Sequence, residues 1–431
     1  MRRGTISTMR AACRTRSSEM SEPALTGRSD KPYREGTRRA RSPAETWARI
    51  KPMLPVFGIT RVANLTGLDR VGIPVFQACR PNGRSLSVFQ GKGLDPDAAR
   101  VSAVMEAIET HCAETIHAPL LFGSAEEIRF SHTLVDLDRL PLTDPAGFDP
   151  FCPILWIEGE ELISGGKRWL PFEMVHANYA LPEPPHSDAL PATTNGLASG
   201  NTDEEAVLHA LLEVIERDAE TLWKLGPMAW GSETAVDPAS VTDPHCRALL
   251  DRFSCAGIDV VIWDVTSDTG IPAIVAMIDD ASGETGAPEI GAGAHLAPEV
   301  ALSRALTEAA QARITYIAGA REDIGDEDYG HEVVAERRSS ARAVLDGLSP
   351  ARRFGDIANL EAENLAADIE VVLASLAAVG IEEVVAVDLT SPPFRLPVVR
   401  VVVPGLEAAM EEADADYVPG SRAAAVLRGD V

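Results

Sequence analysis

Pairs of glutamates three residues apart occur in two segments of the sequence, and a third segment carries a related Glu–Gln pair. In each segment an alanine stands seven residues before the first glutamate, so the three share one frame. The pairs are Glu106 and Glu109, Glu213 and Glu216, and Glu308 and Gln311. In a helix, side chains at i and i+3 lie on one face, about 5–6 Å apart. The repeat therefore predicts three helices that each present an acidic or polar pair.

Two interpretations of these pairs remain open from the spacing alone. Glutamates can simply form a solvated helix face, because exposed like charges disfavour a helix by only roughly a few tenths of a kcal/mol. The pairs, however, border the apolar stripe of their helices rather than opposing it. Four converging carboxylates would repel one another unless cations lay between them, and hard oxygen ligands select magnesium or calcium over zinc.

A glycine-bearing stretch precedes each of the three segments. A glycine-rich turn entering a helix exposes free N–H groups at the positive end of the helix dipole, which suits phosphate. The stretches and the nearby cations are Gly91–Gly93, Asn195–Asn201, Gly291–His295, Lys92, Arg217, Arg304 and Arg313. Magnesium usually takes one or two carboxylates and completes its shell with water and substrate phosphate. The combination predicts a nucleotide bound through magnesium ions, without a Walker or protein-kinase signature.

Apolar periodicity predicts the elements that position these residues. Helices are expected over 95–117, 203–223, 237–256, 297–318 and 361–379. Strands are expected over 75–78, 85–89, 260–265, 272–278, 383–387 and 397–403, and an acidic mobile loop over 322–336. The interleaving of helices and strands predicts an α/β or α+β fold. A simple Rossmann fold is disfavoured, because no Gly-x-Gly-x-x-Gly follows a first strand.

Composition excludes several classes of protein. The 431 residues are 45% hydrophobic and 24% charged, as in a globular protein, and the net charge of −26 repels nucleic acid. The sequence contains no apolar run of about 18 residues, so no membrane-spanning helix is predicted. The six cysteines form no Cys-x-x-Cys pair, which argues against structural zinc and a disulfide framework. We therefore expect a cytoplasmic protein with no nucleic-acid or membrane partner.

The ends of the chain differ in character from its middle. Residues 1–50 contain eleven Arg, one Lys and five acidic residues, a net charge of +7, and lack the apolar core of a secretory signal. We expect a disordered basic extension over 1–45, a folded domain over 46–410 and an acidic flexible tail over 411–431. Met20 begins a more ordinary run and is an alternative start.

Several motifs, in order over about residues 57–408, resemble the YcaO family. They are Gly67–Val75, Gln90–Gly93, Ser102–Glu109, Asn195–Thr202, Leu212–Asp218, Arg304–Arg313 and Pro397–Glu407. The resemblance implies a fold of repeated helix–sheet units around a pocket for ATP and Mg²⁺. One departure is Thr110, which stands where the family usually has an arginine after the second glutamate of the first pair.

The same resemblance implies roles for individual residues. Magnesium ligands would be Glu106, Glu109, Glu213 and Glu216, of which Glu213 and Glu216, with Arg217, would act in catalysis. Contacts to the nucleotide or its ions would come from Lys92, Ser102, Asn195, Ser199, Arg217, Arg304, Glu308 and Gln311.

The family uses ATP to activate a peptide-backbone amide. A nucleophile adds to the amide carbon and phosphate leaves, which yields an azoline, a thioamide or an amidine according to the nucleophile. The sequence is most similar to members that form thioamides with a TfuA-like partner, and it lacks the proline-rich end of azoline-forming members. The resemblance thus implies a peptide or protein substrate, a TfuA-like partner and a homodimer. The alternatives are an azoline-forming cyclodehydratase, a non-catalytic ATP-binding scaffold, and a ligase joining a carboxylate to an amine.

Some residues near the motifs have simpler interpretations. His295 could carry a proton near the phosphates, but without an identifiable partner a structural role is favoured. Trp223 and Trp230 are expected in the core or in a subunit contact. Asp218, Asn201 and Thr202 are expected to cap or start helices.

Overall fold

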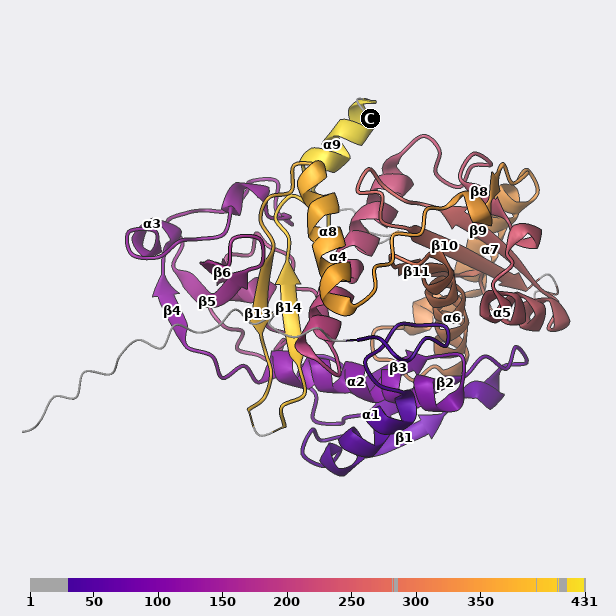
Figure 1. The fold of residues 1–431 in the computed structure, drawn as a ribbon, viewed down its shortest axis with the longest axis horizontal. Coiled ribbons are helices and arrows are strands. Elements are labelled where there is room, and N and C mark those ends of the chain that lie inside the picture. The colour runs from indigo at the N-terminus through magenta and orange to yellow at the C-terminus, as the bar shows by residue number, and fades with distance from the viewer. Residues whose placement is uncertain are drawn as a thin grey trace, which may run out of the picture.

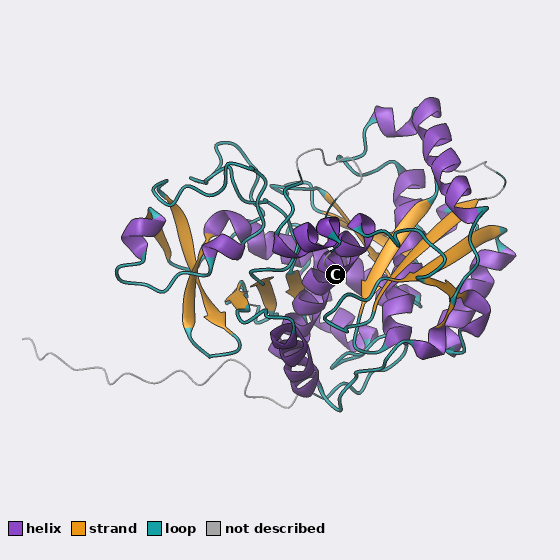
Figure 2. Ribbon diagram, turned by 90° about the horizontal axis from the view of Figure 1, so that it is seen from above, coloured by secondary structure: helices purple, strands orange, loops and turns teal. Residues whose placement is uncertain are grey.

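Helices combine with mostly antiparallel sheets in the computed structural model (Figures 1 and 2). The expected α+β class is thereby confirmed. The structure describes residues 30–280, 282, 286–392, 394–408, 410 and 417–429. None of the helices in these ranges combines the length and apolar character that crossing a bilayer requires.

Three sheets form the framework of the described residues. The first has the order β1 (Arg61–Asn64), β2 (Val75–Cys79), β3 (Val88–Lys92). The second has the order β11 (Glu289–Ala294), β10 (Ala273–Asp280), β9 (Ile258–Asp264), β8 (Ala235–Asp237), β12 (Arg352–Arg353). The third has the order β4 (Leu120–Gly123), β5 (Ile154–Glu161), β13 (Val385–Asp388), β14 (Val398–Val402), β7 (Leu197–Ser199), with β6 (Lys167–Pro171) beside β5. Only β12 and β8 pair in parallel among the strand pairs described.

Helices cover and connect the sheets. They are α1 (Pro43–Ile50), α2 (Pro96–Glu114), α3 (Ala125–Ile128), α4 (Asp203–Leu225), α5 (Pro244–Cys255), α6 (Pro298–Ala318), α7 (His331–Leu345), α8 (Leu365–Ala378) and α9 (Ser421–Arg428). Figure 1 shows α4 and α8 in the middle of the molecule, between β13 and β14 on one side and the sheet of β8 to β11 on the other. The helices expected around the three Glu or Gln pairs are confirmed as α2, α4 and α6.

Each of these three helices follows a strand of a different sheet, so the sequence repeat is a strand–helix unit. The units are β3–α2, β7–α4 and β11–α6. Asp95 caps α2 by accepting from the N–H groups of Asp97 and Ala98, and Thr202 caps α4 by accepting from Glu205 N. The expected capping role of Thr202 is confirmed.

Glycines hold each strand close to the helix that follows it. Gly91 lies in β3, and Gly291 and Gly293 lie in β11, so the loops expected there are strands. A Cβ atom on Gly91 would lie 1.9 Å from Ala103 N, and one on Gly293 would lie 2.2 Å from the carbonyl oxygen of Ala301. Glycine is thus required because the backbones of strand and helix are in direct contact.

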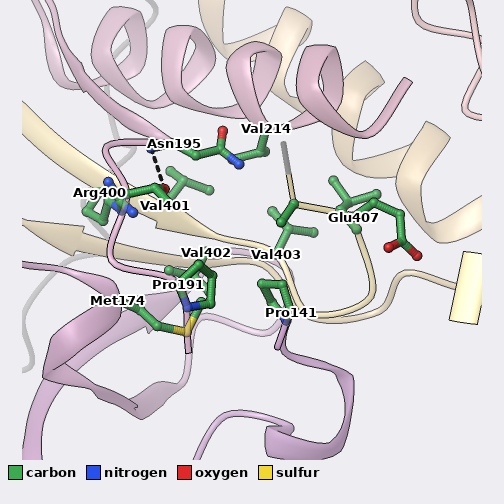
Figure 3. A pocket seen from close by; sticks show the side chains of 13 residues that line it. Pro141, Met174, Pro191, Asn195, Val214, Arg400, Val401, Val402, Val403 and Glu407 are labelled. Carbon is green, nitrogen blue, oxygen red and sulfur yellow. Dashed lines mark hydrogen bonds between the residues drawn. The ribbon is translucent and has the colours of Figure 1, made fainter. Parts of the chain in front are cut away.

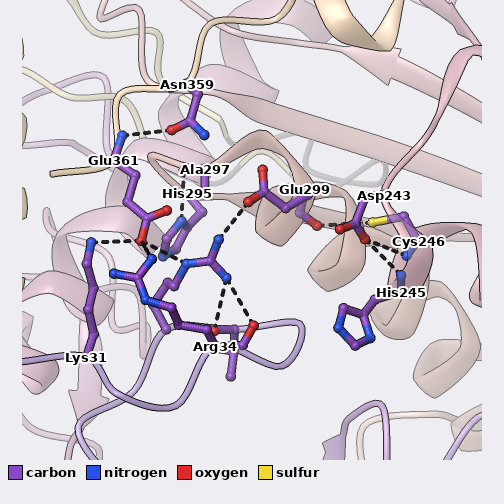
Figure 4. A network of polar contacts seen from close by, with 12 residues as sticks. Lys31, Arg34, Asp243, His245, Cys246, His295, Ala297, Glu299, Asn359 and Glu361 are labelled. Carbon is purple, nitrogen blue, oxygen red and sulfur yellow. Dashed lines mark hydrogen bonds and ion pairs between the residues drawn. The ribbon is translucent and has the colours of Figure 1, made fainter. Parts of the chain in front are cut away.

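Residues 30–45 are ordered, which corrects the expectation of a disordered extension for this part of the chain. Lys31 Nζ lies 2.5 Å from Asp368 Oδ2 and 3.0 Å from Glu361 Oε1, and Figure 4 shows Lys31 beside Glu361. Arg38 contacts Glu361 at 2.8 Å and Glu299 at 2.6 Å. The acidic partners lie more than 250 positions away in sequence, so a local reading of the basic segment could not find them. Residues 1–29 lie outside the described residues.

Residues 417–429 are also anchored, which corrects the expected flexible tail for this segment. The Glu407 carboxylate accepts hydrogen bonds from Tyr417 Oη, Gly420 N and Ala423 N. Arg422 in α9 donates to both carboxylate oxygens of Asp218, each at 3.0 Å. Asp218 therefore lies fully buried inside α4 and does not cap or start a helix. Residues 411–416 lie outside the described residues.

Other local expectations need smaller corrections. The acidic loop expected over 322–336 contains a 3₁₀ turn and the start of α7. The helix expected over 237–256 is a 3₁₀ turn followed by α5, because Asp243 and Pro244 begin a new helix. Trp223 and Trp230 pack edge to face with 4.7 Å between ring centroids, and both lie against Trp263, so they belong to an aromatic core cluster.

Replacing Gly91 with alanine should destabilise the fold by at least ~2 kcal/mol, because the new methyl group would overlap backbone atoms of α2. The control is Gly67→Ala, at an exposed position with no atom within 4 Å of the added Cβ. That variant should stay within ~0.5 kcal/mol of the wild type. The midpoint of thermal or urea unfolding checks both. Equal midpoints for the two variants would contradict the proposed contact between β3 and α2.

Candidate active site

The three strand–helix units are tied to one another in a ring. Glu109 in α2 accepts from the N–H of Ser199 in β7 at 2.8 Å and from its hydroxyl at 2.5 Å. Glu216 in α4 accepts from Ala294 N in β11 at 2.8 Å. Glu308 in α6 binds Lys92, at the end of β3, at 2.6 Å. One carboxylate of each unit thus contacts the strand of the next, and the three helices meet around one centre.

The first glutamate pair has the strongest drive to hold a proton or a cation. Burial, with repulsion from Glu109, raises the pKa of Glu106 to about 8. Glu213 on α4 adds to that repulsion, so the first two helices bring their carboxylates into electrostatic contact. Burial also raises the pKa of Glu109, although the hydrogen bonds from Ser199 oppose the shift.

The second pair lies between these carboxylates and a group of cations. Burial raises the pKa of Glu213 to about 7, with Glu216 and Glu109 adding repulsion and Arg217 opposing it. Gly196 N donates to Glu213 at 3.2 Å. Glu216, only 2% exposed, also has a raised pKa through burial, which Arg217 and Arg304 oppose.

Cations of all three units, namely Lys92, Arg217 and Arg304, surround Glu308. Burial alone would raise the pKa of Glu308, but Lys92, Arg217 and Arg304 lower it to about 2. Arg217 Nη2 lies 3.5 Å from Glu216 and 3.8 Å from Glu308, and Arg304 lies 3.8 Å from Glu216. The repelling carboxylates Glu106, Glu109 and Glu213 therefore form one part of the site. Glu308, surrounded by cations, forms the other part.

Some expected site residues contribute less to this cluster. Ser102 on α2 and Gln311 on α6 form no side-chain hydrogen bond with another expected site residue in the described part of the chain. The Thr110 hydroxyl, which stands in place of the usual arginine, donates to the carbonyl oxygen of Glu106 at 3.0 Å. His295 accepts from Ala297 N at 3.0 Å, and burial lowers its pKa to about 3, which fits a structural role.

Three further arginines near the site were not selected from the sequence. Burial raises the pKa of Glu109, and the positive charge of Arg39 opposes this increase. Arg321 similarly opposes the increase in the pKa of Glu106. Arg400, in β14, interacts with Glu213. The spacing analysis missed them because none lies in the three repeated segments.

The carboxylates fit magnesium on chemical grounds. Their mutual repulsion would be relieved by a cation, and carboxylate oxygens are the ligands that Mg²⁺ prefers. In the residues that the structure describes, no three acidic, His or Cys side chains converge enough to enclose one ion. Mg²⁺ usually takes one or two protein carboxylates and completes its shell with water and phosphate oxygens.

Comparison with known proteins assigns the family. The model of the YcaO cyclodehydratase family, described as ATP- and Mg²⁺-binding, matches residues 90–407. The chain belongs to the YcaO family, whose members bind ATP and Mg²⁺. It is 38% identical, over 91% of its length and 93% of the relative, to an uncharacterized protein of Rhizobium leguminosarum bv. trifolii from the region 3′ of tfuA.

Solved structures agree with this assignment. The YcaO protein of Methanopyrus kandleri, bound with AMPPCP and Mg²⁺, superposes with a TM-score of 0.71 at 25% identity, over 91% of this chain and all of the other. A heterocyclase in complex with substrate and cofactor superposes with a TM-score of 0.74 at 22% identity, which shows the shared fold. The match covers 90% of this chain, which spans only 55% of that heterocyclase.

Removing the charge of Glu106 should stabilise the metal-free protein, and more so at higher pH. Its pKa is raised from 4.5 to about 8, so the folded state keeps a proton that the unfolded chain releases. The wild type should lose this stability as pH rises from about 5 to 8, whereas Glu106→Gln should not.

The measurement is the melting temperature in the presence of a chelator across this pH range. Glu370→Gln, at an exposed position on α8, is the control and should follow the wild type at every pH. A constant difference between Glu106→Gln and wild type from pH 5 to 8 would contradict the burial of this carboxylate beside Glu109 and Glu213.

Proposed function

We propose that this protein uses Mg²⁺ and ATP to phosphorylate the oxygen of a peptide-backbone amide, and that the product is a thioamide formed with a TfuA-like partner. The observation that supports this function most strongly is the ring of carboxylates and cations formed by α2, α4 and α6. Glu106, Glu109, Glu213 and Glu216 would hold the magnesium ions. Lys92, Arg217 and Arg304 would neutralise phosphate oxygens on the other side of the centre.

The geometry suits a triphosphate because opposite charges are separated within one buried site. Burial raises the pKa values of Glu106 and Glu213, and a bound cation would favour the release of their protons at neutral pH. Lys92, Arg217 and Arg304 pair with Glu308, Glu216 and Glu220, and they would turn to phosphate oxygens once magnesium engages the carboxylates. Bound magnesium would neutralise charge that develops on the transferred phosphoryl group. Ser199, Ser102 and Gln311 would complete the nucleotide contacts.

Phosphorylation solves the chemical problem of replacing an amide oxygen. Oxygen is a poor leaving group from an amide, whereas phosphate is a good one. In the proposed sequence sulfide adds to the amide carbon, and the resulting alkoxide takes the γ-phosphoryl group as ADP leaves. The carbon–oxygen bond then breaks, phosphate departs with the electron pair, and loss of the sulfur-bound proton gives the thioamide. Arg217, beside Glu216 and Glu308, would stabilise the negative charge of the transferred group.

Thioamide formation is preferred over azoline formation because of the relative encoded in the region 3′ of tfuA. A sulfur-delivering partner would supply the nucleophile that the chain itself does not provide. In azoline formation the same activation would serve a side-chain nucleophile of the peptide, so the two reactions share the site and differ in their products.

Mg²⁺ with a non-hydrolysable ATP analogue should raise the melting temperature of the wild type. At a ligand concentration one hundred times the dissociation constant, the free energy of unfolding should rise by about 2.7 kcal/mol. Glu213→Gln and Glu216→Gln should lose most of this gain, because each removes a magnesium ligand. Glu370→Gln is again the matched control and should retain it. Differential scanning fluorimetry with and without Mg²⁺ measures the shift, and an unshifted wild type would contradict nucleotide binding and with it the proposed function.

Co-expression of the protein with a TfuA-like protein and a neighbouring small peptide gene should add sulfur to the peptide. Mass spectrometry should show the exchange of one oxygen for one sulfur, located at a backbone amide by fragmentation. Glu216→Gln should abolish the exchange. Loss of one water molecule instead would assign the protein to azoline formation, and a new bond between two separate substrates would assign it to a ligase class.

A further inference from the structure

A pocket lies between α4 and strand β14, and Val214, the residue after Glu213 on α4, is part of its wall. Its polar residues are Thr193, Asn195, Arg400 and Glu407. Apolar side chains complete the lining, namely Pro141, Met174, Pro191, Val214, Val401, Val402, Val403, Leu406 and Ala408. Figure 3 shows Asn195 and Val214 along one side of this pocket, with Met174, Pro191 and Pro141 along the other.

Arg400 in this pocket is a buried cation whose Nε finds no hydrogen-bond acceptor among the described residues. It is only 3% exposed, on a strand that pairs on both sides, with Val387 of β13 and Leu197 of β7. Its Nε has no hydrogen-bond partner, and within the described residues no carboxylate forms an ion pair with its guanidinium group. Burial lowers the pKa of Arg400 to about 10, although Glu213 opposes this shift. A buried charge left in this state costs stability, so its retention calls for a ligand.

Asn195 contributes an unused hydrogen-bond acceptor to the same pocket. Its amide oxygen Oδ1 is buried and also lacks a hydrogen-bond partner, while its backbone N–H donates to Thr193 Oγ1 at 3.0 Å. The pocket therefore offers one unused donor and one unused acceptor among largely apolar walls. The Glu407 carboxylate does not use either of them, since it is occupied by the segment from Tyr417 to Ala423.

We propose that this pocket binds the peptide substrate, with Arg400 donating to a backbone carbonyl oxygen and Asn195 accepting from a backbone N–H. The inference rests on the proposed function and adds to it the site where the peptide lies. A peptide bond presents one acceptor and one donor, which matches the two unused groups. A nucleotide phosphate fits less well, because it has no N–H for Asn195 Oδ1 to accept. The apolar walls also favour a neutral ligand.

The location of the pocket suits the reaction. Arg400 interacts electrostatically with Glu213, and Val214 in the pocket wall is the next residue along α4. A peptide in the pocket would therefore lie beside a residue expected to hold a magnesium ion. Arg400 is in this account a substrate-binding residue, and its positive charge would also stabilise an oxygen that becomes negative after the nucleophile adds.

The first test compares two buried arginines, using melting temperatures of the free protein. Arg400→Met should leave the melting temperature unchanged or raise it, because an unpaired buried charge is removed. Arg80→Met is the matched control, since Arg80 is also 2% exposed but forms an ion pair with Glu114. That variant leaves a buried carboxylate unpaired and should lower the melting temperature. A comparable loss for Arg400→Met would show a structural arginine and overturn the proposal.

The second test titrates a blocked, uncharged peptide, N-acetyl-glycyl-glycine N-methylamide, into protein that holds Mg²⁺ and a non-hydrolysable ATP analogue. NMR of ¹⁵N-arginine-labelled protein follows the Arg400 Nε–H signal, assigned by its absence in Arg400→Met. In the wild type this signal should shift saturably as the hydrogen bond forms. Calorimetry should show at least tenfold weaker peptide binding by Arg400→Met, with only partial recovery in Arg400→Lys.

The same samples separate this proposal from the proposed function. If Mg²⁺ and the analogue stabilise the wild type and Arg400→Met alike while the peptide distinguishes them, the peptide site is supported. A loss of nucleotide stabilisation in Arg400→Met, an unmoved Arg400 signal, or equal peptide binding by both proteins would overturn it. A wild type that gains no stability from the nucleotide would instead contradict the proposed function.

Discussion

Carboxylates that reach from one strand–helix unit to the strand of the next are the interaction on which the rest of the structure depends. Glu109 binds Ser199, Glu216 binds Ala294 N, and Glu308 binds Lys92. Because the three ties close a ring, displacement of any one unit would break two of them. The glutamates that connect the units are thus also members of the buried group of charged side chains that forms the candidate active site.

This construction has an energetic cost that function explains. Burying several carboxylates together raises the pKa values of Glu106 and Glu213, and the isolated protein must protonate them or tolerate their repulsion. Arg400 shows the same pattern with the opposite sign. A chain selected for stability alone would have little reason to keep either. Bound cations and a hydrogen-bonding substrate would relieve both, so the strain lies where ligands are expected.

The sequence was most informative where the pattern is local and repeated. Helical periodicity and the shared frame predicted α2, α4 and α6 with their Glu or Gln pairs, and in the structure Glu109, Glu216 and Glu308 each contact the strand of another unit. It was least informative where partners are distant. The basic residues of 30–45 appeared to belong to a disordered extension, yet Lys31 and Arg38 are held by Glu361, Asp368 and Glu299. Arg422 and Asp218 likewise pair across about half the chain.

The sequence by itself determined which helices carry carboxylates, because i, i+3 spacing fixes the face of a helix whatever surrounds it. It also determined the family, through motifs of sufficient length. Only the tertiary structure decided that the glycines of β3 and β11 serve close strand–helix contact, and that Arg400 lies buried with no ion pair to any carboxylate of the described ranges. Those properties depend on which backbone or side chain comes from elsewhere in the chain to fill the space, and no local pattern in the sequence records that.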